Sequence, residues 1–161
     1  MVTSAAHTPP DSPESRLLSL HIDLPPAPQP AANYVTATQS GNLVFLSGQG
    51  PILNGEVIYR GRVGTELSEE QGYQAARLTT LNSLAILRQH LGSLDRVARV
   101  LKLLAWVHCE HGFQKQHLVL NGASDLLVEV FGERGRHARS AVGMQIPSDF
   151  AVEVEAIFEV R

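Results

Sequence analysis

The sequence predicts a single α/β domain of the α+β kind, in which two helices cover one face of a mixed β-sheet. The chain has 161 residues, which is about the length of one domain and enough to bury one sizeable core. Two segments carry apolar residues at helical spacing, and most of the other apolar segments are short and bounded by turn-forming residues. In chain order the segments predict the arrangement β-β-(β)-α-β-α-β-β.

The N-terminal segment predicts little regular structure. Residues 1–13 are rich in Pro, Ser and Thr and hold few apolar groups, so we expect a flexible tail followed by one domain over residues 14–161. Ser12 and Pro13 are typical of a helix start, and they favour a short helix over "ESRLLSL". The proline-rich "LPPAPQPA" that follows predicts an extended connection.

The first half of the domain predicts a hairpin and a long helix. Strands "NYVTATQ" and "LVFLSGQ" flank the turn "SGN", and "LNGEV" predicts a second tight turn. Residues 68–91 open with the capping-box pattern Ser-Glu-Glu-Gln, and Gly92 follows the last helical residue. This segment predicts the longer of the two helices.

The second half predicts a central strand, a helix and two more strands. Residues 96–108 are so continuously apolar that we expect a strand covered on both faces. Residues 113–131 predict the second helix, with Gly132 just past its end. Strands at residues 138–144 and 151–160 flank the turn "IPSD".

The last strand predicts an interface. One face is apolar from Val152 to Val160, whereas Glu153, Glu155 and Glu159 share the other face with a single hydrophobic residue, Ile157. Since the preceding central strand is apolar on both sides, the helix-free face of the sheet also needs a cover. The chain supplies no third layer, so we expect another subunit there.

Composition limits the classes of partner and compartment. The net charge of −3 comes from well-mixed acids and bases, so nucleic acid is not the expected partner. Cys109 is the only cysteine, which excludes an intrachain disulfide and a cysteine-based metal cluster within one chain. No apolar run is long enough to cross a bilayer, and we expect no membrane contact and a soluble cytoplasmic protein.

Two short motifs each suggest a binding site, and each also has a simpler structural interpretation. "HCEH" at residues 108–111 suggests a metal site, but alternation along a strand turns His108 and Glu110 away from Cys109 and His111, so no metal is expected. "SGQG" at residues 47–50 has a flexible backbone whose N–H groups are able to hold a carboxylate oxygen. The simpler reading of "SGQG" is a turn at the end of a strand.

Arg139 is the candidate with the clearest chemistry. It shares its strand face with Ala141 and Gly143, and these small residues leave a hollow around the guanidinium. An arginine in a hollow suits a planar carboxylate, which its fork binds with two hydrogen bonds. A surface arginine on an edge strand is an equally good reading of the sequence.

Three blocks together resemble a known family: "NYVTATQSGNLVFLSGQGP", "LNGASDLLVEVFG" and "ARSAVGMQIPSDFAVEVEAI". The chain resembles a divergent branch of the RidA (YjgF) family of reactive imine and enamine deaminases, also described as endoribonucleases, over residues 33–160. The resemblance implies a chorismate-mutase-like (bacillar) fold and a homotrimeric barrel with clefts between subunits. It also implies hydrolysis of 2-imino acids such as 2-iminopropanoate to 2-oxo acids and ammonia, without a cofactor.

The resemblance also implies roles for individual residues. Arg139 would bind the substrate carboxylate with help from the Gly48 N–H, and Glu153 would be the acid that handles water. The other cleft positions implied are Tyr34, Ser47, Asn121 and Ala141. Ala141 stands where many members have cysteine, and the run from Arg139 to Pro147 is one residue shorter than usual.

Two other functions compete with deamination. The first is a non-catalytic trimer that binds small carboxylates in the same cleft. The second is a ribonuclease, which the absence of a basic stripe or an aromatic stacking platform disfavours.

Overall fold

The computed structural model describes residues 11–161, so most of the predicted tail lies outside the described residues. Helix α1 (Pro13–Ser19) begins as the sequence predicts, because the Ser12 side chain accepts a hydrogen bond from the Ser15 N–H and Pro13 opens the helix. Glu14 fixes α1 to the rest of the domain through Arg88 at 3.3 Å and the Leu94 N–H at 2.9 Å.

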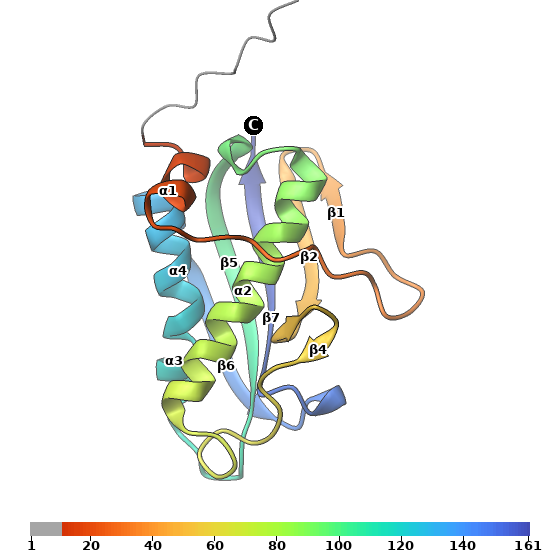
Figure 1. The fold of residues 1–161 in the computed structure, drawn as a ribbon, viewed down its shortest axis with the longest axis vertical. Coiled ribbons are helices and arrows are strands. Elements are labelled where there is room, and N and C mark those ends of the chain that lie inside the picture. Colours follow the sequence, from red (N-terminus) through yellow and green to blue (C-terminus); the bar gives the residue numbers. More distant parts are fainter. Residues whose placement is uncertain (1–10) are drawn as a thin grey trace, which may run out of the picture.

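A five-stranded mixed sheet forms the centre of the fold (Figure 1). The strand order is β1-β2-β7-β5-β6, and every neighbouring pair is antiparallel except β5 and β6, which run parallel. A separate pair of short strands, β3 (Ile52–Leu53) and β4 (Glu56–Val57), forms the predicted second turn. The bounds of the main strands are β1 (Ala37–Ser40), β2 (Leu43–Gln49), β5 (Val97–His108), β6 (Ala138–Met144) and β7 (Val152–Val160).

The helices lie together on one face of this sheet, as predicted (Figure 1). The long helix α2 (Glu69–Leu91) has the predicted capping box at Ser68 and ends at Gly92, whose φ of 83° is in the left-handed region. Among residues 11–161, short 3-10 turns cover Leu94–Arg96, Gly132–Gly135 and Pro147–Asp149. In the described part of the chain, no helix is both long and apolar enough to cross a membrane.

The second predicted helix, over residues 113–131, is instead two helices. Helix α3 (Gln116–Val119) is a single turn, and α4 (Asn121–Phe131) starts after Leu120, where the Ala123 N–H bonds to the Leu120 carbonyl three residues back. Gly122 packs so closely on α2 that a side chain there would collide with the Tyr73 carbonyl oxygen. The break at Leu120 places Asn121 in the first turn of α4, beside the edge strand β6.

The two faces of the sheet are buried to different degrees. On the face toward the helices Leu103, Ala105 and Val107 are fully buried. On the helix-free face the side chains of Leu104 and Trp106 are half-buried, and three more apolar side chains are exposed to solvent. These are Phe45, Val142 and Met144, with exposed fractions of 38%, 47% and 46%. This chain therefore covers one face of β5, and cover of the other face by a second subunit stays a prediction.

Candidate functional site

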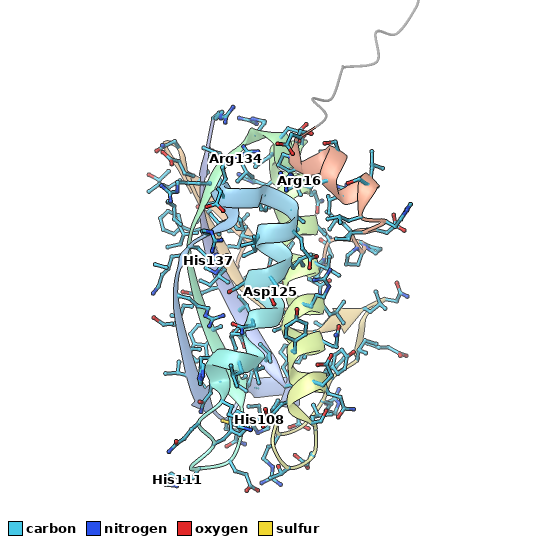
Figure 2. The ribbon with its side chains drawn as sticks, turned by 90° about the vertical axis from the view of Figure 1, so that its left-hand side faces the viewer. Arg16, His108, His111, Asp125, Arg134 and His137 are labelled. Atoms are coloured by element: carbon cyan, nitrogen blue, oxygen red, sulfur yellow. The ribbon has the colours of Figure 1, made fainter. Side chains whose placement is uncertain are left out.

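Arg139 lies on edge strand β6 and points to the helix side of the sheet. It pairs in register with Leu103, whose side chain is buried against the helices, and paired residues share a face. Figure 2 shows the molecule from the side, with α4 in front between the sheet on the left and α2 on the right, and it labels Asp125 on α4 and His137 beside the sheet. The strand and the start of α4 thus enclose the guanidinium between them.

Three oxygen atoms hold the Arg139 guanidinium. Nη1 donates to Asn121 Oδ1 at 3.2 Å and to Ser124 Oγ at 2.9 Å, and Nη2 donates to the His117 carbonyl at 2.9 Å. A guanidinium has five N–H donors. Among the described residues, one donor on Nε and one on Nη2 therefore have no hydrogen-bond partner.

The charge of Arg139 is not matched by an ion pair among residues 11–161. Burial lowers the pKa of Arg139 from its ordinary value, and Asp125 opposes this change without cancelling it. A half-buried cation that keeps two free donors has the chemistry that suits an anionic ligand. Residues of α3 and α4 thus flank the Arg139 guanidinium on one side, and the hollow around it stays a prediction.

His137 and Ser124 extend the hydrogen bonds around Arg139. His137 Nε2 lies 3.0 Å from Ser124 Oγ, and His137 Nδ1 lies 2.6 Å from the Gly135 carbonyl. Neither residue was predicted from the sequence. The signal that identifies them is spacing: Ser124 follows Asn121 by one helical turn, and His137 precedes Arg139 by two positions on an extended segment.

Two predicted residues accompany Arg139 on this face. Asn121, predicted to bind substrate, uses its amide oxygen to hold the guanidinium. Ala141 is partly buried against the core. Further along, the Cys109 thiol occupies the space over Gly143, and burial raises the pKa of that thiol. The thiol on this face of β6 thus belongs to Cys109, just after β5, and not to a residue at position 141.

Glu153 lies on the opposite, helix-free face. It pairs with Trp106 on β5, and its carboxylate has neither a hydrogen bond nor an ion pair with any residue in 11–161. Burial raises the pKa of Glu153, and the neighbouring Glu155 carboxylate raises it further. A hollow of about 260 Å³ opens beside it, lined by Trp106, Met144, Ile146, Pro147 and Glu153.

Gly48 makes room for the Glu153 carboxylate. The register of β2 and β7 shifts between Leu46 and Gln49, so Ser47 and Gly48 form a β-bulge opposite Glu155. A side chain at position 48 would collide with Glu153 Oε1. The sequence predicts that a ligand carboxylate approaches the backbone at Gly48. In the structure, the carboxylate that approaches Gly48 belongs to Glu153 of the same chain.

Ser47 and Tyr34 lie on the same side of the molecule as Gly48. The Ser47 hydroxyl donates to the Val35 carbonyl at 2.7 Å, and the Tyr34 hydroxyl accepts from the Ala31 N–H at 3.2 Å. The Tyr34 side chain has an exposed fraction of 45%. These hydrogen bonds thus stabilise residues 31–35, which precede β1. The Tyr34 ring stays exposed to solvent.

The predicted site residues fall into two groups that do not meet within one chain. Arg139, Asn121 and Ala141 lie on the helix side of β6, whereas Tyr34, Ser47, Gly48 and Glu153 lie around β2 and β7. Their partners on β5, Leu103 and Trp106, are three positions apart, so Arg139 and Glu153 point to opposite faces. Glu153, the acid that the resemblance implies for the site, therefore does not reach Arg139 within one chain.

The "HCEH" motif lies at the end of β5, and its Cys109 thiol lies against Gly143 of β6. His108 is buried, and its Nδ1 is 3.2 Å from Asp149 Oδ1. Figure 2 shows His108 and His111 at the end of the molecule that is opposite Arg134. Among residues 11–161, no group of three or more His, Cys, Asp or Glu side chains has a geometry that could hold a metal ion.

The mixed sheet with its helices on one face defines a chorismate-mutase-like protein of the α+β class. The family model described as "YjgF/chorismate mutase-like, putative endoribonuclease" matches residues 14–149. The chain therefore belongs to this family, which confirms the resemblance to RidA (YjgF) proteins that the sequence predicts.

Individual relatives agree with this assignment. Protein TCP17 of Trypanosoma cruzi is 44% identical over 149 residues, which cover 91% of this chain and 93% of that protein. A putative endoribonuclease from Shewanella oneidensis is 35% identical with a TM-score of 0.89, covering 92% of this chain and 99% of its own. A protein of unknown function from Agrobacterium tumefaciens is 44% identical with a TM-score of 0.86, covering 92% of each chain.

Proposed function

We propose that the protein hydrolyses reactive 2-imino acids, such as 2-iminopropanoate, to 2-oxo acids and ammonia at sites completed by neighbouring subunits of a homotrimer. One observation carries this function: the half-buried Arg139 guanidinium has no ion-pair partner among the described residues and keeps free donors on Nε and Nη2. Because these two nitrogens belong to one planar fork, a carboxylate is able to bridge them.

The carboxylate anchor fixes the position of the imine carbon. A substrate held by two parallel hydrogen bonds cannot rotate freely about the bond to its carboxylate, so the adjacent C=N group faces one direction. Asn121, Ser124 and the His117 carbonyl keep the guanidinium itself in place. The helix side of one chain thus supplies binding and orientation, and Asp125, the carboxylate there that acts on the Arg139 charge, already accepts a hydrogen bond from the Tyr73 hydroxyl.

Glu153 of a second subunit is suited to the proton transfers. Water adds to the imine carbon: a C–O bond forms as the C=N π bond breaks, and one water proton passes through the carboxylate to the nitrogen. When the C–N bond breaks, the hydroxyl proton follows the same route and ammonia leaves, so Glu153 returns to its starting state. A carboxyl group whose pKa is raised by burial exchanges protons near neutral pH more readily than an exposed one.

The exposed sheet face supports the trimer. Phe45, Val142 and Met144 lie on the same helix-free face as Glu153, so another subunit that covers them also reaches the hollow beside Glu153. If the covering surface includes the β6 edge and α4 of that subunit, Arg139 and Glu153 come from different chains and face one ligand. A cyclic arrangement of three copies repeats this contact at every interface.

Release of ammonia and 2-oxo acid from freshly generated 2-iminopropanoate and 2-iminobutanoate tests the function. We expect faster release than spontaneous hydrolysis and a trimeric mass in solution. If pyruvate binds but release is not accelerated, the protein is a carboxylate-binding trimer without catalysis. A monomeric mass, or cleavage of RNA in place of imine hydrolysis, would overturn the proposed function.

A further inference from the structure

A continuous set of hydrogen bonds connects the Gly135 carbonyl to Arg139. It runs from the carbonyl to His137 Nδ1 at 2.6 Å, from His137 Nε2 to Ser124 Oγ at 3.0 Å, and from Ser124 Oγ to Arg139 Nη1 at 2.9 Å. The participants come from the turn before β6, from β6 itself and from α4. Segments distant in sequence therefore converge on one side of a single guanidinium.

The chemistry of the end groups determines the direction of the two outer bonds. A carbonyl oxygen only accepts, so His137 Nδ1 carries a hydrogen; a guanidinium only donates, so Ser124 Oγ accepts from Arg139. Burial, and secondarily the charge of Arg139, lower the pKa of His137, which favours the neutral ring. Its Nε2 then has a lone pair and accepts the hydrogen of the Ser124 hydroxyl.

We propose that Ser124 and His137 are positioning residues for Arg139, and that they keep its free Nε and Nη2 donors turned toward the ligand carboxylate. A serine inside a helix otherwise tends to donate its hydroxyl hydrogen to the carbonyl four residues earlier. His137 accepts that hydrogen instead, which fixes the Ser124 rotamer with a lone pair toward Nη1. The Ser124 oxygen is also the better acceptor because its own hydrogen is engaged.

This positioning role rests on the proposed function, because both assume a carboxylate ligand at Arg139. Ligand-binding measurements test the positioning role without turnover. The probe is 2-oxobutanoate, and its affinity is measured by calorimetry for wild type, Ser124→Ala, Ser124→Thr and His137→Phe. We expect Ser124→Ala and His137→Phe to bind about tenfold more weakly, and Ser124→Thr, which keeps the hydroxyl, to bind within about twofold of wild type. The affinity for the uncharged 2-oxobutanamide should change little in any variant, because this ligand has no carboxylate to bridge the Nε and Nη2 donors of Arg139.

Two control variants match the changes at positions distant from Arg139. Ser19→Ala removes an exposed serine hydroxyl from the end of α1, and His111→Phe replaces an exposed histidine in a loop. Both should bind 2-oxobutanoate like wild type. Thermal melting confirms that every variant is folded. Wild-type affinity in folded Ser124→Ala and His137→Phe proteins would overturn the positioning role.

Nuclear magnetic resonance tests the same role when no ligand is bound. In wild type, the ¹⁵N shifts of His137 should show a protonated Nδ1 and an Nε2 that accepts a hydrogen bond, and Ser124→Ala should move the Nε2 signal. Rotation of the Arg139 guanidinium should be faster in Ser124→Ala than in wild type. The opposite tautomer, or unchanged rotation, would refute the inference. If these signatures appear but no imine is hydrolysed, only the proposed function fails.

Discussion

The two faces of the sheet carry the candidate arginine and the candidate acid, and the two side chains differ in how far their surroundings hold them in place. On the helix side, Arg139 is held by three oxygen atoms and is ready to bind an anion. On the helix-free side, Glu153 has no hydrogen-bond or ion-pair partner among the described residues and stands at a hollow with apolar walls. Under the proposed function, one chain thus supplies the binding half of the site, and a neighbouring subunit encloses the acid half.

Replacement of Arg139 is expected to have the largest effect. Arg139→Ala should lower turnover of 2-iminopropanoate by about 100-fold or more, because both the charged hydrogen bonds and the orientation they impose are lost. Arg139→Lys should recover little, since an ammonium attracts a carboxylate without fixing its plane. Steady-state kinetics measures the effect, with oligomer mass as the folding control. Near-normal turnover by a trimeric Arg139→Ala protein would reduce Arg139 to a surface residue.

Replacement of Glu153 should give a loss of a different kind. Glu153→Gln keeps the shape of the side chain but cannot relay protons, so kcat should fall by about 100-fold. The affinity for 2-oxobutanoate should change little, because the carboxylate anchor lies on the other face. A Glu153→Gln variant that loses binding and keeps kcat would show that Glu153 binds the ligand and does not relay protons.

Mixing the two inactive variants tests whether the faces of different chains meet. If each site takes Arg139 from one subunit and Glu153 from another, trimers reassembled from Arg139→Ala and Glu153→Gln chains contain some intact sites. Random assembly of equal amounts should restore roughly a quarter of the wild-type sites. Each variant reassembled alone is the control. If activity stays at the level of the separate variants, sites between subunits are excluded.

A methyl group at position 48 should produce a moderate effect. Gly48→Ala places a Cβ against Glu153 Oε1, so the carboxylate must shift within its hollow. We expect kcat to fall about tenfold with little change in 2-oxobutanoate affinity, because the helix side is untouched. Gly41→Ala, at a hairpin position with a φ of 58° where a Cβ meets no other atom within 4 Å, introduces backbone strain distant from Glu153 and so controls for general destabilisation. Equal kinetic effects of the two substitutions would contradict the role of Gly48.

Local patterns predicted most of the elements. The capping box at Ser68 and the glycine at position 92 marked the bounds of α2, and alternation identified β6 and β7. These signals act within a few residues and depend little on the rest of the fold. The break at Leu120 was not predictable in this way, because it accompanies the close packing of Gly122 on α2, a contact between distant segments.

The candidate residues were predictable one by one, but their grouping was not. Alternation along a strand shows that Arg139 shares a face with Ala141, yet it does not show which face of the sheet this is. That depends on the pairing of β6 and β7 with β5, which places Arg139 and Glu153 on opposite sides. The contact of His137 with Ser124 likewise joins the turn before β6 to α4, and only the packed structure brings them together.

The smallest expected effect is a pH dependence of stability that distinguishes the two faces. Glu153 has a raised pKa in the folded chain, so the fold favours its protonated form. Its contribution to the free energy of unfolding is therefore present below the ordinary carboxyl pKa and is lost as the pH rises through the raised value. His137 has a lowered pKa, so its contribution is present above the ordinary histidine pKa and is lost as the pH falls.

Urea unfolding across about pH 4 to 8 should show Glu153→Gln gaining stability relative to wild type as the pH rises, and His137→Phe gaining relative to wild type as the pH falls. Parallel curves for wild type and Glu153→Gln would mean that Glu153 titrates like an exposed acid and that the hollow beside it stays open to water.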